Sequence, residues 1–292
     1  MFTMKRSYFK KMLSALLPIL ILATQTTILS CKGNGKKNEK NEIVVTVDAN
    51  GKANGDHRFS KIDDSNFYID DIRYTAQNGD LIVSGYDEAF FKGEAKLISQ
   101  LNYNGREMRV LAIRDEAFYE CKELTSIVIP PYVTNIGISS FSKCEKLTSV
   151  SIPNNVTNIG ETAFNECSSI TSINIPDNLI SIGKGAFYKC SSLTAVKIPK
   201  GVTIIDDYTF ANCKKLAYVT IPENVTTIGT CCFYGCESLM QVRMKAKTPP
   251  KIDYITFTNR RNATLLVSFG CKSVYESSNF WDEFKEIIEE AQ

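Results

Sequence analysis

Cysteine is the residue type in this sequence whose spacing could do chemistry. The chain has ten cysteines among 292 residues. Six of them follow one another at intervals of 23 residues: Cys121, Cys144, Cys167, Cys190, Cys213 and Cys236. Thiols can form disulfides, bind a metal ion, act as nucleophiles or fill a core as compact apolar groups. Because zinc sites combine cysteine and histidine at short spacing, this interval predicts no metal site.

Other catalytic groups are sparse. The single histidine, His57, lies in the polar stretch of residues 51–61, which we predict to be an exposed loop. A thiol protease needs one distinctive cysteine in contact with a histidine, whereas most cysteines here are equivalent by position. Neighbouring acids such as Asp63 and Asp64 point in different directions and predict no two-carboxylate hydrolase site. Phosphate-binding and dinucleotide-binding glycine motifs are absent from the sequence. We therefore predict neither enzymatic activity nor a cofactor.

The cysteines belong to a longer repeat. A phenylalanine precedes each one by three residues, and the unit has the pattern A-F-x-x-C-x-x-L-T-S-V-x-I-P-x-x-V-T-x-I-G. Self-similarity at this period is typical of a solenoid. Within the unit, L-x-x-V-x-I alternates as a short strand with one buried face, and the following proline ends it. Stacked units would place six such strands in one parallel sheet. We expect a positive φ or close backbone approach at Gly137, Gly160, Gly183 and Gly229.

The solenoid suggests a structural role for the cysteines. Residues one period apart stack, so the thiols would form a column with Cα atoms about 5 Å apart. We interpret this column as a ladder of buried thiols in a tight bend. Disulfides are the alternative, because the spacing lies within their range and an exported protein can oxidise. Cys232 occupies the repeat's alanine position and is predicted to be core, whereas Cys231 and Cys271 lie outside the column.

The repeat resembles that of the BspA-like leucine-rich repeat proteins, whose 23-residue pattern is L-x-x-I-x-L-P-x-x-L-x-x-I-G-x-x-A-F-x-x-C. The similarity covers about residues 110–244, and the flanking segments resemble that family's caps. The expected fold is a repeat solenoid of 23-residue coils with short parallel strands on one face, capped at both ends. We place the N-terminal β cap at residues 43–109, the solenoid at 110–245 and the C-terminal cap at 246–292. The resemblance implies interaction at a cell surface, including adhesion to host proteins or other cells, and names no ligand.

The N-terminus predicts export. Four basic residues precede a short apolar run in residues 1–30, as in a signal peptide. This run ends in "ILSC", which resembles a lipobox with Cys31 as the lipidated residue. Residues 31–42 lack large apolar side chains and predict a flexible tether. We expect the protein to be anchored by a lipid in the bacterial outer membrane. We favour a protein that faces the cell exterior over one that faces the periplasm. Plain secretion after cleavage is the alternative to lipidation.

Binding would use the open face of the predicted sheet. The strand register turns two residues of each unit outward: Ser126 and Val128, Ser149 and Ser151, Ser172 and Asn174, Ala195 and Lys197, Tyr218 and Thr220, and Gln241 and Arg243. Since tyrosine and arginine often dominate interfaces, we select five candidate ligand-binding residues from the C-terminal half: Lys197, Tyr218, Thr220, Gln241 and Arg243. The expected ligand is a protein or a glycan. The alternative is that these residues are merely solvated. A net charge of +2 favours neither nucleic acid nor direct membrane binding.

Overall fold

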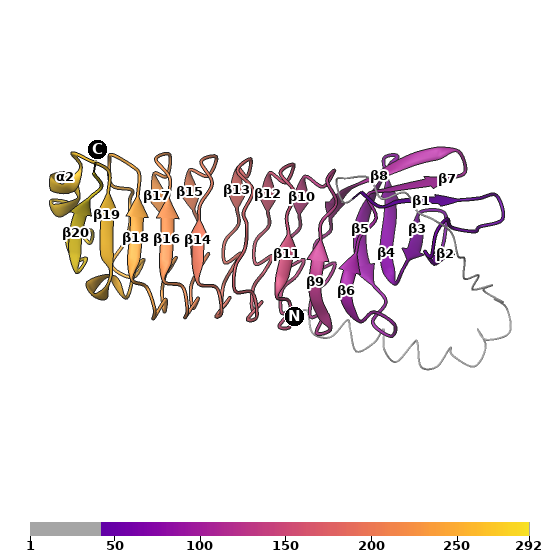
Figure 1. Ribbon diagram of the computed structural model, residues 1–292, viewed down its shortest axis with the longest axis horizontal. Coiled ribbons are helices and arrows are strands. Elements are labelled where there is room, and N and C mark those ends of the chain that lie inside the picture. The colour runs from indigo at the N-terminus through magenta and orange to yellow at the C-terminus, as the bar shows by residue number, and fades with distance from the viewer. Residues whose placement is uncertain (1–41, 292) are drawn as a thin grey trace, which may run out of the picture. The chain divides into compact units, whose positions relative to one another are not determined.

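The computed structural model describes residues 42–291. The predicted signal peptide, Cys31 and the predicted tether up to residue 41 lie outside the described residues. The predicted fold class is confirmed: about eight coils of about 23 residues form a β-solenoid with almost no helix. Successive coils stack in chain order (Figure 1). Among the described residues, no helix is long and apolar enough to cross a membrane.

The N-terminal part of the described chain is built of strands β1 (Val44–Val47), β2 (Phe59–Lys61), β3 (Asn66–Ile69), β4 (Ile72–Gln77), β5 (Asp80–Tyr86), β6 (Gly93–Lys96), β7 (Gln100–Tyr103) and β8 (Arg106–Ile113). Strands β2 to β5 pair antiparallel in chain order, and β7 pairs antiparallel with β8. Two strands of this region pair in parallel with the first strands of the solenoid: β5 pairs with β8, and β6 pairs with β9 (Leu124–Val128). The parallel stacking of the solenoid therefore begins before the repeat pattern can be recognised.

Five of the six predicted strands of the open face are present, and they do not form one sheet. Strands β6, β9 and β11 (Ser149–Ser151) form a three-stranded sheet. A second sheet of five strands contains β14 (Ala195–Lys197), β16 (Tyr218–Ile221), β18 (Gln241–Met244), β19 (Thr264–Val267) and β20 (Glu286–Glu289). Residues 171–176, between these sheets, form no strand. The prediction of a continuous six-stranded sheet is therefore wrong, and nothing in the sequence of this unit explains the interruption next to β11.

A second set of parallel strands, which the sequence analysis did not predict, lies at the V-T-x-I segment of each unit (Figure 1). Its members are two residues long: β10 (Asn135–Ile136), β12 (Asn158–Ile159), β13 (Ser181–Ile182), β15 (Ile204–Ile205) and β17 (Thr227–Ile228). Strand β8 continues this set through its pairing with β10. The coil is thus held to its neighbours at two flat sides and at the turn that carries the cysteine.

Glycine at the end of the unit brings neighbouring coils together. A Cβ added at Gly160 would lie 2.7 Å from the backbone of Gly137 in the preceding coil. The Gly160 N–H donates a 2.8 Å hydrogen bond to the Ile136 carbonyl. Close approach is therefore confirmed, whereas the alternative of a positive φ is wrong for all four of these glycines.

One interface departs from this arrangement, and we call it the seam: it joins the coil of residues 164–183 to the coil of residues 187–206. Asp206 occupies the glycine position there, and its Cβ takes the space that close approach requires. Among the described residues, the Asp206 N–H makes no bond to Ile182, and β13 does not pair with β15. The seam also lacks a side-chain bridge. One period earlier, the Asn178 amide donates a 3.1 Å hydrogen bond to the Asn154 carbonyl of the preceding coil, whereas Gly201 at the equivalent position has no side chain to do so.

The turn side remains continuous through the seam. The repeat phenylalanines are fully buried and stack in one column, with centroids 5.5 Å apart for Phe164 and Phe187 and 5.3 Å apart for Phe187 and Phe210. The column continues into Phe257, 4.7 Å from Phe233, and ends against Trp281. The parallel strand pairing of the open face continues through β19 and β20. The cap boundaries at residues 109 and 245 stay predictions.

Candidate binding surface and cysteine column

The six repeat cysteines lie in the core as free thiols. From the second onward, each Sγ donates a hydrogen bond to the carbonyl oxygen of the phenylalanine 26 residues earlier. The pairs are Cys144 to Phe118, Cys167 to Phe141, Cys190 to Phe164, Cys213 to Phe187 and Cys236 to Phe210, at 3.1–3.3 Å. The thiols thus satisfy buried carbonyl groups between coils, which is a structural role.

Burial also determines the chemistry of these thiols. Desolvation raises the pKa of Cys121 to about 11 and that of Cys190 and Cys236 to about 12. A neutral thiol is a poor nucleophile and a poor metal ligand, because the thiolate does both kinds of chemistry. Among residues 42–291, no group of three or more His, Cys, Asp or Glu side chains could hold a metal ion. Cys232 is buried as predicted, and Cys271 is buried as well.

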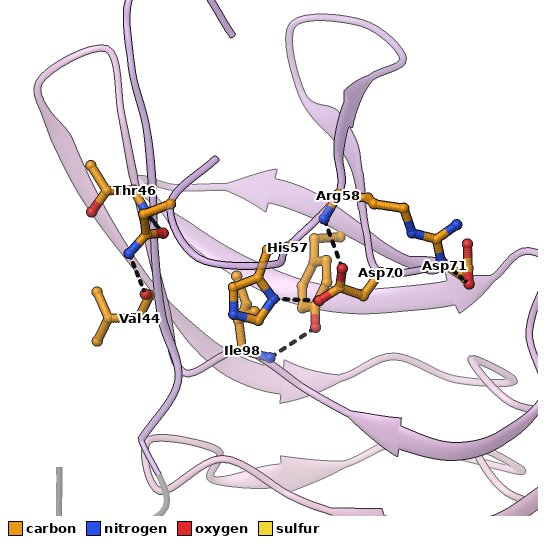
Figure 2. A network of polar contacts seen from close by, with 9 residues as sticks. Val44, Thr46, His57, Arg58, Asp70, Asp71 and Ile98 are labelled. Carbon is orange, nitrogen blue, oxygen red and sulfur yellow. Dashed lines mark hydrogen bonds and ion pairs between the residues drawn. The ribbon is translucent and has the colours of Figure 1, made fainter. Parts of the chain in front are cut away.

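His57 is held in a polar network instead of projecting into solvent (Figure 2). Its Nδ1 contacts the carboxylate of Asp70, and its side chain is 25% exposed. The predicted exposed loop is found up to residue 58, whereas residues 59–61 form β2, and His57 itself is only partly exposed. Asp70 and Asp71 form the turn between β3 and β4, with φ values of 51° and 70°. Asp70 also accepts a 2.8 Å hydrogen bond from the Arg58 N–H.

This network has no catalytic arrangement. The partner of His57 is a carboxylate, and no hydroxyl or thiol of residues 42–291 makes a hydrogen bond to the imidazole. The hydrogen bond to Asp70 raises the pKa of His57; burial opposes this shift, and the charges of Asp70 and Asp56 add to it. His57 therefore fastens residues 56–58 to the β3–β4 turn as an ion pair.

The five candidate ligand-binding residues lie together on the open face. Lys197, Thr220 and Arg243 occupy one register row across β14, β16 and β18. Tyr218 and Gln241 occupy the parallel row two residues earlier. With neighbouring strands about 4.8 Å apart, each row places its first and third residues about 10 Å apart. Tyr218 is the one aromatic residue among these five, and 51% of its surface is exposed.

Two of these candidates are engaged with acidic side chains. The Arg243 Nε lies 2.7 Å from Glu290, and the Lys197 Nζ lies 3.7 Å from Asp177. Both pairs are substantially exposed, so they contribute little to stability and can be exchanged for contacts with a ligand. The Tyr218 hydroxyl donates to the Met240 sulfur at 3.9 Å.

Sequence reasoning missed the apolar continuation of this face. Met240 is 59% exposed, and Leu266 and Ile288 extend the row of Arg243 onto β19 and β20. The alternating segments "TLLV" and "EIIE" carry the same pattern as the repeat strands. They could have been found by extending the register into the region interpreted as a cap.

The repeat region matches one known family model. The family model described as BspA type leucine rich repeat region matches residues 111–280 in six copies. A leucine-rich repeat protein from T. pallidum is 25% identical, covering 58% of this chain and 88% of its own, with a TM-score of 0.46. One from Bacteroides ovatus is 23% identical over 77% of this chain and 76% of its own, with a TM-score of 0.38.

A leucine rich cell surface protein from Faecalibacterium prausnitzii is also similar. It is 16% identical, covering 80% of this chain and 97% of its own, with a TM-score of 0.30. No match was found among curated proteins. The solved structures are too distant to support any statement about a ligand, so the family assignment depends on the repeat match.

Proposed function

We propose, on the premise that this chain belongs to the BspA-type leucine-rich repeat family, that it is a non-catalytic recognition or adhesion protein. The observation that carries the proposal is the joint presentation of Lys197, Tyr218, Thr220, Gln241 and Arg243 on neighbouring strands of one open sheet. Solenoids of this kind chiefly offer extended binding surfaces. The ligand is a protein or a glycan outside the cell, and the membrane is contacted only through a lipid on Cys31.

The chemistry of the face supports a macromolecular ligand. Tyr218 offers a rigid ring with a polar end, and Arg243 offers a planar cation, the two residue types most often found at the energetic centre of interfaces. Gln241 and Thr220, beside them, supply hydrogen-bond donors and acceptors. The opposite end of the open face, at Ser126 and Ser149, offers no exposed aromatic ring on β6, β9 or β11.

A second candidate is a structural lipoprotein that faces the periplasm. Lys32, Lys36 and Lys37 follow Cys31, where an acidic signal for surface export is often found, and this observation favours the periplasmic side. Protease treatment of intact cells separates the two candidates. Degradation of the protein on intact cells supports surface recognition, and protection until the outer membrane is opened supports the structural role.

The binding proposal is tested with the full chain on an array of extracellular proteins and polysaccharides. We expect Tyr218→Ala combined with Arg243→Ala to weaken binding by more than about tenfold. The melting temperature should barely change, because both side chains are exposed. Ser126→Ala combined with Ser149→Ala is the matched control at the other end of the face. An equal loss of binding affinity in the two double variants would contradict a binding site at β14, β16 and β18.

A further inference from the structure

The interruption of the open face leaves a row of backbone donors without partners. The N–H groups of residues 171–175 make no hydrogen bond within the described part of the chain. In the preceding coil, the equivalent Thr148 N–H donates to Thr125 at 2.9 Å. Within residues 42–291, only one backbone bond crosses to the following coil on this face, from the Thr194 N–H to the Thr171 carbonyl at 3.1 Å. Peptide groups without an internal partner at this position are therefore available to a ligand.

The separation does not extend to the phenylalanine side of the coils. Phe141 and Phe164 stack at 5.1 Å, and Phe164 and Phe187 at 5.5 Å, so the coils keep their normal spacing on the phenylalanine side. The Phe164 N–H still donates to Ala186 at 2.8 Å. Admitting an extra β-strand would require about 4.8 Å of additional separation, which the closed turn side opposes. The gap therefore suits a small ligand and not an inserted peptide.

A cavity of about 150 Å³ opens at this place, lined by Asn154, residues 173–177 and Lys197. The side-chain amides of Asn154 and Asn174 have no hydrogen-bond partner among the described residues. Asp177 and Lys197 lie 3.7 Å apart at its rim, so their charges compensate each other. The volume corresponds to about five water molecules, well below that of a pocket for a drug-sized molecule.

These properties restrict the ligand. An apolar group would leave the amides and the peptide groups without partners, which is costly. An anion would meet only one cation, and that cation is already paired with Asp177. A small neutral molecule with several hydroxyl groups fits, because a hydroxyl donates to carbonyl groups and accepts from N–H groups.

We propose that this cavity is a subsite for one neutral sugar unit of a glycan. The proposal rests on the proposed recognition function and names its ligand class. Asn154 and Asn174 hydrogen-bond the sugar hydroxyls from two coils, and the N–H groups of residues 173–175 donate from the floor. Asp177 and Lys197 bind hydroxyls at the rim.

The neighbouring surface would accommodate further sugar units. Ala195 separates the cavity from Tyr218, and its small side chain leaves the path open. Tyr218 lies two coils beyond Asn174 and two residues earlier in the register, about 12 Å away, and presents a half-exposed ring on which the C–H face of a sugar can pack. A short oligosaccharide thus reaches both the cavity and the predicted binding residues.

The test uses the full chain and a panel of neutral tetrasaccharides of glucose, mannose, xylose and N-acetylglucosamine. Amide hydrogen exchange and titration calorimetry are measured at millimolar sugar. At least one sugar should bind and slow exchange at Ile173 and Ile175. Asn174→Ala should weaken that sugar's binding by about tenfold, the effect of one lost hydrogen bond to a ligand. Asn135→Ala, the same change at an exposed asparagine on another face, should not.

The proposal is overturned if no sugar in the panel slows exchange at these amides. It is also overturned if Asn154→Ala and Asn174→Ala both leave binding unchanged. A glycan or protein whose binding depends on Tyr218 but not on Asn174 refutes the subsite and leaves the proposed function standing. If binding is unchanged in Asn154→Ala and in Asn174→Ala, and also when Tyr218 and Arg243 are replaced, the subsite and the proposed binding face are both refuted.

Discussion

The Sγ of Cys167 donates a hydrogen bond to the carbonyl oxygen of Phe141, 3.1 Å away in the preceding coil. The same relationship recurs along the column, so each thiol couples two coils through a buried polar contact. The alternative of neighbouring disulfides would remove this donor, because a bridged sulfur carries no proton.

For the thiol column, we expect Cys167→Ser to lower the free energy of unfolding by about 1–3 kcal/mol, because a smaller polar group replaces a buried thiol. Cys167→Ala should cost at least as much, since it leaves the Phe141 carbonyl without its donor. Urea unfolding measures both, with Cys231→Ser, outside the column, as the control. Stoichiometric bridges between column cysteines in non-reduced protein would contradict the thiol ladder.

Alkaline pH should weaken the fold through the same cysteines. In the unfolded chain these thiols ionise near pH 9, whereas burial holds the folded pKa of Cys190 at about 12. Between these values the folded state binds more protons than the unfolded state, so the free energy of unfolding falls as pH rises. Urea unfolding from about pH 8 to 10 should show this decline, before the tyrosines of the unfolded chain ionise fully. Cys190→Ala should make the slope shallower; an identical slope would contradict this origin.

At the seam, Asp206→Gly should let the coils close. Without the Cβ, the residue 206 N–H can reach the Ile182 carbonyl, as the Gly229 N–H reaches Ile205 at 2.7 Å. We expect the amide of residue 206 to become protected from hydrogen exchange. The change in global stability should be small, because the added bond is offset by about 1 kcal/mol of glycine entropy. Asp206→Ala is the control, since it keeps the Cβ and should leave that amide exchanging quickly. Equal protection in the two variants would show that the Cβ does not hold the seam open.

The ion pair of His57 predicts a pH-dependent contribution to stability. Because the folded pKa is raised, the contribution is complete below the unfolded pKa of about 6.5 and is lost as pH rises through the folded value. His57→Ala should therefore cost about 1 kcal/mol near pH 5 and less near pH 9. Urea unfolding at the two pH values measures the difference. A cost that is independent of pH would indicate lost packing in place of the ion pair.

The lipid anchor is tested by Cys31→Ala. We expect the variant to leave the membrane fraction, because the predicted lipidated residue is gone. Cell fractionation with immunodetection measures this, and Cys271→Ala is the matched control. If Cys31→Ala stays with membranes at the wild-type level, another feature holds the protein there.

The coiled architecture could be predicted from the sequence alone, down to the thiol column and the prolines that follow the strands. In a solenoid the neighbours of a residue are its own counterparts one period away, so the spacing of Phe141, Phe164 and Phe187 already specifies their contact. The grouping of Lys197, Thr220 and Arg243 followed from the same register.

Only the tertiary structure revealed the seam, the unpaired amides of residues 171–175, and the contact between His57 and Asp70. Both of the first two depend on how closely backbones approach. At the seam, the single Cβ of Asp206 outweighs the pattern shared by all units, whereas no residue of the unit explains the unpaired amides of residues 171–175. The contact of His57 joins a loop to a turn outside the repeat, where no period relates one residue to another. Periodicity determines which residues face each other, whereas steric fit between particular atoms decides where the coils close and where they stay open.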